Sequence, residues 1–154
     1  MDREPLKGMV NVNEKPITPR WARARGRLYL RPATVERVRR GEVEKGDPYE
    51  IARTAALLAV KSTHHIIPHC HPVPVGGVAV SFREAEDHIE VEVDVEAHYR
   101  TGVEMEALTG VAVALLTLWD VLKRYEKDER GQYPATSISE IEVIEKRKGG
   151  AYEQ

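Results

Sequence analysis

A proline-rich loop contains the residues best suited to chemistry. Four histidines and the only cysteine fall within segment 64–71, with prolines at 68, 72 and 74 restricting the backbone. Zinc prefers imidazole and thiolate ligands, so one hypothesis is a zinc-dependent hydrolase that uses His64, His65, His69 and Cys70. The spacing of these residues matches no familiar zinc signature. Because histidine also exchanges protons near neutral pH, His71 is the better candidate as a catalytic acid or base.

Charged residues at both ends of the apolar segment 103–127 form further candidate sites. Glu104 and Glu106 lie at its start, and Asp120 and Lys123 lie three residues apart near its end. Taken alone, the two glutamates complement a helix dipole, and the aspartate and lysine form an ordinary surface ion pair. Neither pair is evidence of a site by itself.

Helix geometry connects the two pairs. Glu106 and Asp120 are 14 residues apart, which is roughly 21 Å along an α-helix. One small pocket does not reach that far, so functional groups at both ends predict a site shared between two subunits of a two-fold dimer. Lys45, beside Gly46, is a third candidate, either as a phosphate contact or as an ordinary solvated lysine.

The hydrophobic pattern predicts the elements that hold these residues. Asp47 and Pro48 are a typical helix start, and segment 89–96 alternates apolar and acidic residues as a half-buried strand does. The expected strands are 17–30, 78–82, 89–96 and 138–147, and the expected helices are 34–40, 48–64 and 103–127. This order predicts an α+β ferredoxin-like sandwich, an antiparallel sheet with two long helices on one face. We expect an arm over 1–8, one domain over 9–150 and a tail over 151–154.

Composition excludes several classes of protein. The 154 residues carry a net charge of −2, which argues against nucleic-acid binding by bulk electrostatics. A single cysteine cannot form an intramolecular disulfide, and the chain opens without a signal-sequence pattern. The longest uninterrupted apolar runs are far shorter than the roughly 20 residues that span a bilayer. We therefore expect a cytoplasmic protein with no membrane or nucleic-acid partner.

Several strings together resemble the molybdenum cofactor biosynthesis protein C family. The most specific are Ile-Pro-His-Cys-His-Pro at 67–72 and Thr-Gly-Val-Glu-Met-Glu-Ala-Leu-Thr at 101–109, and the resemblance covers about residues 8–150. It implies a ferredoxin-like subunit in a hexamer, a trimer of dimers with sites at the dimer interface. It also implies cyclic pyranopterin monophosphate synthase activity, which rearranges a cyclised guanosine-derived triphosphate and releases pyrophosphate.

The resemblance also assigns roles to residues. The family's catalytic groups fall on Asp120, Lys123, Lys45 and His71. Its substrate contacts fall on His69, Cys70, His71, Glu104, Met105, Glu106, Arg20, Lys61 and Lys148. No cofactor is implied as required, and Mg²⁺ on the triphosphate is left open.

This sequence departs from the family's usual residues at several positions. These are Asn11, Ser62 and His69, where the family usually has aspartate, often has arginine and commonly has leucine. The family's terminal lysine corresponds to Lys146, Arg147 or Lys148, with Arg147 in place if the following glycines are aligned.

Overall fold

The computed structural model describes residues 3, 8–149 and 151–152. Most of the expected arm over 1–8 and half of the expected tail over 151–154 lie outside these residues. The helices, in chain order, are α1 (Pro32–Arg39), α2 (Pro48–Lys61), α3 (Thr63–Ile66) and α4 (Glu104–Glu126). The strands are β1 (Thr18–Tyr29), β2 (Val75–Glu84), β3 (His88–Tyr99), β4 (Ser137–Lys148) and β5 (Ala151–Tyr152).

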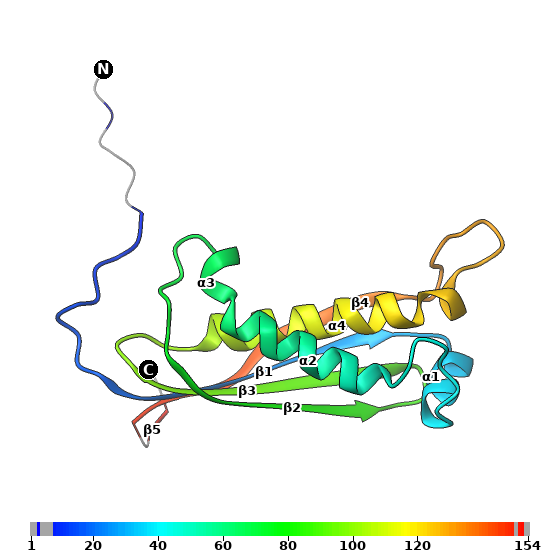
Figure 1. The fold of residues 1–154 in the computed structure, drawn as a ribbon, viewed down its shortest axis with the longest axis horizontal. Helices are drawn as coiled ribbons and strands as arrows, with labels where there is room; N and C mark the ends of the chain where they lie inside the picture. The colour runs from blue at the N-terminus through cyan, green and yellow to red at the C-terminus, as the bar shows by residue number, and fades with distance from the viewer. Residues whose placement is uncertain (1–2, 4–7, 150, 153–154) are drawn as a thin grey trace.

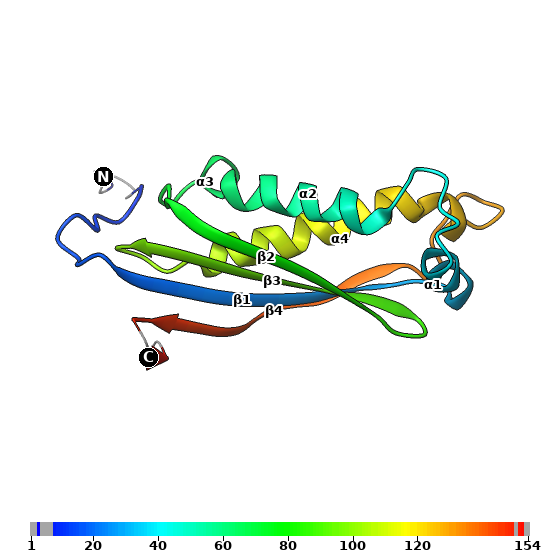
Figure 2. The same cartoon turned by 60° about the horizontal axis from the view of Figure 1, so that its bottom comes forward.

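The strands form one antiparallel sheet in the order β2-β3-β1-β4-β5. The long helices α2 and α4 lie side by side on one face of this sheet (Figures 1 and 2). We call this the helix face, and the opposite side the outer face. The predicted α+β ferredoxin-like sandwich is confirmed.

Strand β1 lies at the centre of the sheet and alternates strictly between the two faces. Ala22, Ala24, Gly26 and Leu28 are buried on the helix face, whereas the arginines between them point to the outer face. Alanine and glycine contribute little to a hydrophobicity pattern, so only an irregular alternation is visible in the sequence here. Their small size lets α4 approach the middle of the sheet closely.

Helix α4 is packed tightly against the sheet and against α2. A Cβ atom at Gly26 would lie 2.8 Å from Leu115 Cδ1 and 2.9 Å from Val111 Cγ1. A Cβ atom at Gly110 would lie 2.8 Å from Val60 Cγ2, where α4 crosses α2. Two glycines therefore allow both close approaches, and the contacts fix where α4 lies along the sheet.

The apolar composition of α4 belongs to this core. Among the described residues, α4 is the one helix that is long and apolar enough to cross a membrane by length and composition. Its leucines and valines at the buried positions face β1, β3 and α2, and half of its most apolar window is buried inside the protein. Packing within the domain accounts for its hydropathy.

A buried carboxylate fastens the C-terminal end of α4. Glu126 is fully buried and accepts hydrogen bonds from the Arg31 backbone N–H at 3.2 Å, from the Thr34 hydroxyl and from the Thr136 hydroxyl at 2.7 Å. These partners lie at the start of α1 and just before β4. The interaction satisfies the N-terminal N–H of α1 and joins three segments at one point.

Two boundaries differ from the sequence predictions. The helix expected over 48–64 ends at Lys61, because the Thr63 hydroxyl bonds back to the carbonyl oxygens of Ala59 and Val60 and a separate short helix, α3, follows. The helix expected from residue 34 begins at Pro32, since proline fits the first turn of a helix.

The outer face of the sheet carries a ladder of ion pairs. Arg23 on β1 contacts Asp94 at 2.8 Å and Glu92 at 3.1 Å on β3, and Arg25 contacts Glu90 at 3.2 Å. Arg25 and Arg27 also pair with acids on β4. The basic run near the start of the chain and the acidic strand at 89–96 thus neutralise each other within one sheet.

We expect the Gly110→Val substitution to lower the free energy of unfolding by about 1–3 kcal/mol, because the new side chain overpacks the contact between α4 and α2. Arg124→Lys, at an exposed position of the same helix, is the control and should change it by no more than about 0.5 kcal/mol. Urea denaturation measures both. Equal losses in the two variants would contradict the close packing at Gly110.

Candidate active site

The N-terminal end of α4 holds a buried carboxylate beside the only thiol. Glu106 is 2% exposed, and Cys70 Sγ lies 3.3 Å from its Oε2. Burial raises the pKa of Glu106, and burial together with the nearby Glu106 carboxylate raises the pKa of Cys70 to about 12. Cys70 therefore remains a thiol at neutral pH and donates its proton to the carboxylate.

The other carboxylate oxygen of Glu106, Oε1, is the one that indicates a ligand site. Oε1 is buried and has no hydrogen-bond partner among the described residues. Oε2 of the neighbouring Glu104 is in the same state. A buried acceptor without a partner costs free energy, and two such oxygens on one helical turn form a polar site suited to a ligand that donates hydrogen bonds.

Basic residues lie at the ends of β1 and β4, and one of them contacts Glu104. Lys146 Nζ lies 3.5 Å from Glu104 Oε1. Arg20 is buried and donates from Nη2 to the carbonyl oxygen of Arg100 at 3.2 Å. Arg20 and Lys148 are register partners, so Lys148 lies on the helix face as well.

The alternation of side chains along β4 shows which of Lys146, Arg147 and Lys148 lies beside Glu104 and Glu106. Lys146 pairs with Ala22 and points to the helix face, whereas Arg147 pairs with Trp21 and points to the outer face. A register shift between Arg23 and Ala24 accompanies this placement. Aligning the glycines favoured Arg147, and the geometry favours Lys146.

The proline-rich loop 67–74 also contacts the N-terminal segment. His71 Nε2 lies 2.6 Å from the Val10 carbonyl oxygen, and because a carbonyl can only accept, Nε2 carries the proton. Met105 on α4 is 37% exposed, and His69 and Lys61 are exposed and make no hydrogen bond or ion pair with the Glu106 carboxylate.

A second group of candidates lies toward the other end of α4. Asp120 Oδ1 lies 2.9 Å from Lys123 Nζ, and Lys45 Nζ lies 3.9 Å from Asp120 Oδ2 and donates to its carbonyl oxygen at 3.1 Å. The hydrogen bond between Asp120 and Lys123 lowers the pKa of Asp120 and raises the pKa of Lys123. The aspartate is therefore a carboxylate and Lys123 an ammonium at neutral pH.

Tyr133 belongs to this second group and was not identified from the sequence. It adds, after Asp120, to the rise in the pKa of Lys123. Its ring packs edge-on against Trp119 at 5.2 Å between centroids, and Trp119 precedes Asp120 on α4. The irregular loop between α4 and β4 gives no periodicity from which this placement follows.

The structure thus brings the predicted site residues together as two groups rather than one. Cys70, Glu104 and Glu106 lie around the start of α4, and Lys45, Asp120 and Lys123 lie around its last third. The helix is straight between them in Figure 1, consistent with a separation of roughly 21 Å. One chain offers two half-sites.

The geometry does not favour the zinc hypothesis. The tilted rings of His64 and His65 pack against each other at 3.9 Å between ring centroids, while Cys70 points toward Glu106 and His71 toward Val10. Within residues 8–149, no three histidine, cysteine or acidic side chains are arranged to hold a metal ion. The donors that are close in sequence point in different directions.

Comparisons with known proteins agree with the resemblance seen in the sequence. The MoaC family model matches residues 9–149. A protein of Methanoregula boonei is 55% identical over 141 residues, covering 92% of this chain and 91% of its own length. Another from Pyrococcus furiosus is 55% identical over 140 residues, covering 91% and 90%. A third from Thermococcus kodakarensis is 52% identical over 141 residues, covering 92% and 90%. Each is named probable cyclic pyranopterin monophosphate synthase.

We expect Glu106→Gln to stabilise the fold at neutral pH. Because the folded pKa of Glu106 is raised, the stability contributed by its protonation is complete below the unfolded pKa of about 4.3 and is lost as the pH rises through the folded value. Each unit of that rise corresponds to about 1.4 kcal/mol.

Thermal unfolding between pH 4 and pH 8 measures this effect. The variant should exceed the unchanged protein in Tm at pH 8, and the difference should shrink toward pH 4. Glu129→Gln, at an exposed position, is the control and should show no such trend. A pH-independent difference for Glu106→Gln would contradict a charge buried at neutral pH.

Proposed function

This chain belongs to the MoaC family, and we propose that it is a cyclic pyranopterin monophosphate synthase of molybdenum cofactor biosynthesis. Such a lyase converts (8S)-3′,8-cyclo-7,8-dihydroguanosine 5′-triphosphate into cyclic pyranopterin monophosphate and pyrophosphate. The observation that carries the proposal is a family match over residues 9–149 in a chain whose family-assigned polar residues form two half-sites.

The half-site at the start of α4 is suited to the ring system of the substrate. The guanine-derived ring carries adjacent N–H donors, and Glu106 offers a buried oxygen that lacks a donor. Cys70 keeps the other oxygen occupied, which leaves Oε1 directed at the ligand. We assign Glu106, Glu104 and Met105, with residues 69–71, to substrate binding.

The half-site toward the end of α4 is suited to proton transfer and to charge stabilisation. A ribose hydroxyl attacks the α-phosphate, the cyclic phosphate forms, and pyrophosphate leaves with its negative charge. Lys45 and Lys123 supply cations for that charge, and the carboxylate of Asp120 accepts protons during the ring rearrangement. His71, with Nε2 protonated, is assigned as a further proton donor.

Phosphate binding in this proposal relies on the chain's own basic residues. Arg20, Lys61 and Lys148 extend the cationic surface on the side of the first half-site. The reaction rearranges and cyclises its substrate without a net oxidant, so the mechanism includes no resident cofactor, and Mg²⁺ bound to the triphosphate is compatible with it.

The separation of the half-sites supports a site completed by a second chain. We propose a dimer in which one subunit supplies Glu106 and its partner supplies Asp120, assembled three times into a hexamer. The solvent-facing sides of α2 and α4 expose Leu57, Leu58 and Leu116 at 42%, 59% and 58%, which provides apolar surface for such contacts. A nucleotide-derived substrate fits the proposed cytoplasmic location.

We expect the full-length protein to release pyrophosphate from the cyclised nucleotide and to form the cyclic monophosphate. Asp120→Ala and Lys123→Ala should each reduce turnover by at least about 100-fold while leaving the fold intact, because both residues are exposed and both act in proton or charge transfer. Lys127→Ala, just beyond α4, is the control. No pyrophosphate from the unchanged protein would refute the enzyme, and normal rates in either variant would refute its assigned role.

Mixing two inactive variants tests the shared site. Subunits with Asp120→Ala and subunits with Glu106→Ala should regain part of the activity after they are unfolded and refolded together, because a mixed dimer contains one intact site. About a quarter of the unchanged activity is expected from random pairing. Mass spectrometry confirms the mixing. If mixed dimers form without activity, the site lies within one chain.

A further inference from the structure

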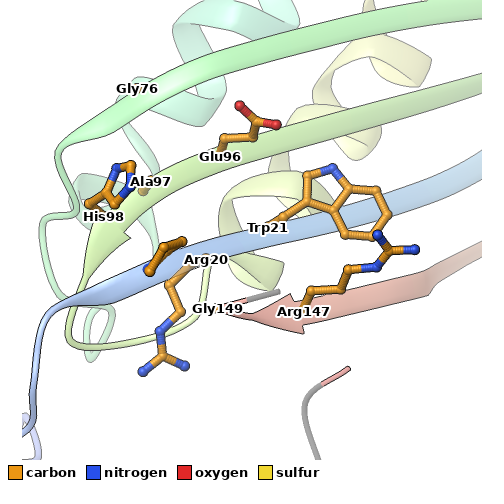
Figure 3. Close-up of a pocket in the computed structure, with 9 residues that line it drawn as sticks. Arg20, Trp21, Gly76, Glu96, Ala97, His98, Arg147 and Gly149 are labelled. Carbon is orange, nitrogen blue, oxygen red and sulfur yellow. The ribbon is translucent and has the colours of Figure 1, made fainter. Parts of the chain in front are cut away.

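The outer face of the sheet contains a hollow near the ends of β1, β3 and β4, and its lining includes Arg20. Its volume is about 490 Å³, within the range of small-ligand sites. Figure 3 shows its lining, with the indole of Trp21 between Glu96 and Arg147. Gly76 on β2 and Gly149 after β4 complete two of its sides.

The hollow lies where the ion-pair ladder of the outer face is interrupted. Along β3, Glu90, Glu92 and Asp94 are each paired with arginine. Glu96 is the next carboxylate on that face, and it makes no hydrogen bond or ion pair with the described residues. Its register partner on β1 is Trp21, in the place where an arginine would continue the ladder.

Glycines on β2 keep the Glu96 carboxylate accessible. Gly77 is the register partner of Glu96, and a Cβ atom at Gly77 would lie 3.6 Å from Glu96 Oε2. A side chain there would lie against the carboxylate and cover it. Without one, the carboxylate stays uncovered on the outer face, directed toward β2 in Figure 3.

The three principal groups form one row across the sheet. Glu96 pairs with Trp21, and Trp21 pairs with Arg147. Since neighbouring strands lie about 4.8 Å apart, the row is roughly 10 Å long. Arg147 Nη2 lies 2.9 Å from Glu145 Oε1. The Cζ atom of Arg147 lies 5.0 Å from the centroid of the Trp21 ring. A hydrogen-bond acceptor, an aromatic surface and a positive charge follow in that order.

From this row we propose that the hollow is a second ligand site, for a mononucleotide or pterin phosphate that carries the 2-amino-4-oxo ring edge of guanine. The ring N–H and amino group of that edge donate to the Glu96 carboxylate, and the ring stacks on Trp21. The phosphate lies toward the charge of Arg147. Base and phosphate of a mononucleotide are separated by a distance similar to the length of the row.

The proposed site is distinct from the half-site at Glu106. Trp21, Glu96 and Arg147 lie on the outer face, and Glu106 lies on the helix face under α4. The sheet lies between these side chains, and Arg20, at the end of β1, is the residue that the hollow shares with the first half-site. A ligand on the outer face therefore does not need to be a substrate, and its binding is separable from turnover.

Calorimetric titration of the full-length protein with GMP, IMP and AMP tests the proposal. GMP should bind most tightly, IMP about tenfold more weakly because it lacks the amino donor, and AMP most weakly because its ring edge does not match the carboxylate. Glu96→Gln should remove the preference for GMP over AMP. Trp21→Leu should weaken GMP binding by at least about tenfold, and Trp21→Phe, which keeps an aromatic ring, by less.

Two controls separate this site from the proposed active site. Glu142→Gln changes an exposed acid of the outer face outside the hollow and should leave GMP binding unchanged. Glu106→Gln should remove only GMP that binds at the proposed active site, and the binding that depends on Glu96 and Trp21 should remain. The proposal is overturned if GMP does not bind at millimolar concentration. It is also overturned if binding is lost in Glu106→Gln but retained in both Glu96→Gln and Trp21→Leu.

Discussion

The placement of α4 across the sheet is the constraint on which the rest of the molecule depends. Gly26 and Gly110 allow backbone-close contacts with β1 and α2, and Glu126 fastens the far end of the helix to α1 and to the segment before β4. A rigid helix held at these points cannot bend to bring its two charged ends together. The distance between the half-sites is therefore a property of the fold, and the proposed dimer rests on that distance.

Two buried glutamates on α4 differ in how completely their carboxylate oxygens are hydrogen-bonded. Each oxygen of Glu126 has hydrogen-bond donors from the protein, so its burial is compensated and it holds three segments together. Glu106 has one oxygen occupied by Cys70 and one without a partner. The uncompensated oxygen costs stability in the protein alone, and a ligand with N–H donors would recover that cost. An oxygen without a hydrogen-bond partner, more than burial, distinguishes Glu106, the proposed ligand-binding carboxylate, from Glu126.

The sequence was sufficient for elements whose pattern is strong. The periodicity of 103–127 and the alternation of 89–96 predicted α4 and β3 to within a few residues, and helix length alone predicted two separated groups. The sequence was insufficient where tertiary packing determines the local structure. Inward alanines and a glycine concealed the alternation of β1, and the Thr63 hydroxyl ended α2 early through bonds to the preceding turn. Contacts between distant segments, such as Cys70 with Glu106, follow from no local pattern.

The histidine loop shows why residue type is a weaker guide than direction. Four histidines and a cysteine within eight residues suggested a metal site, yet their side chains lie against different neighbours. His71 reaches the N-terminal segment at Val10, and Cys70 reaches α4 at Glu106. The prolines restrict the loop to a conformation in which the side chains of neighbouring residues point in different directions. The loop therefore contacts two segments that are distant in sequence, near the start of α4. The Trp21 hollow illustrates the converse, because its glutamate, indole and guanidinium come from three strands far apart in sequence and meet only through strand register.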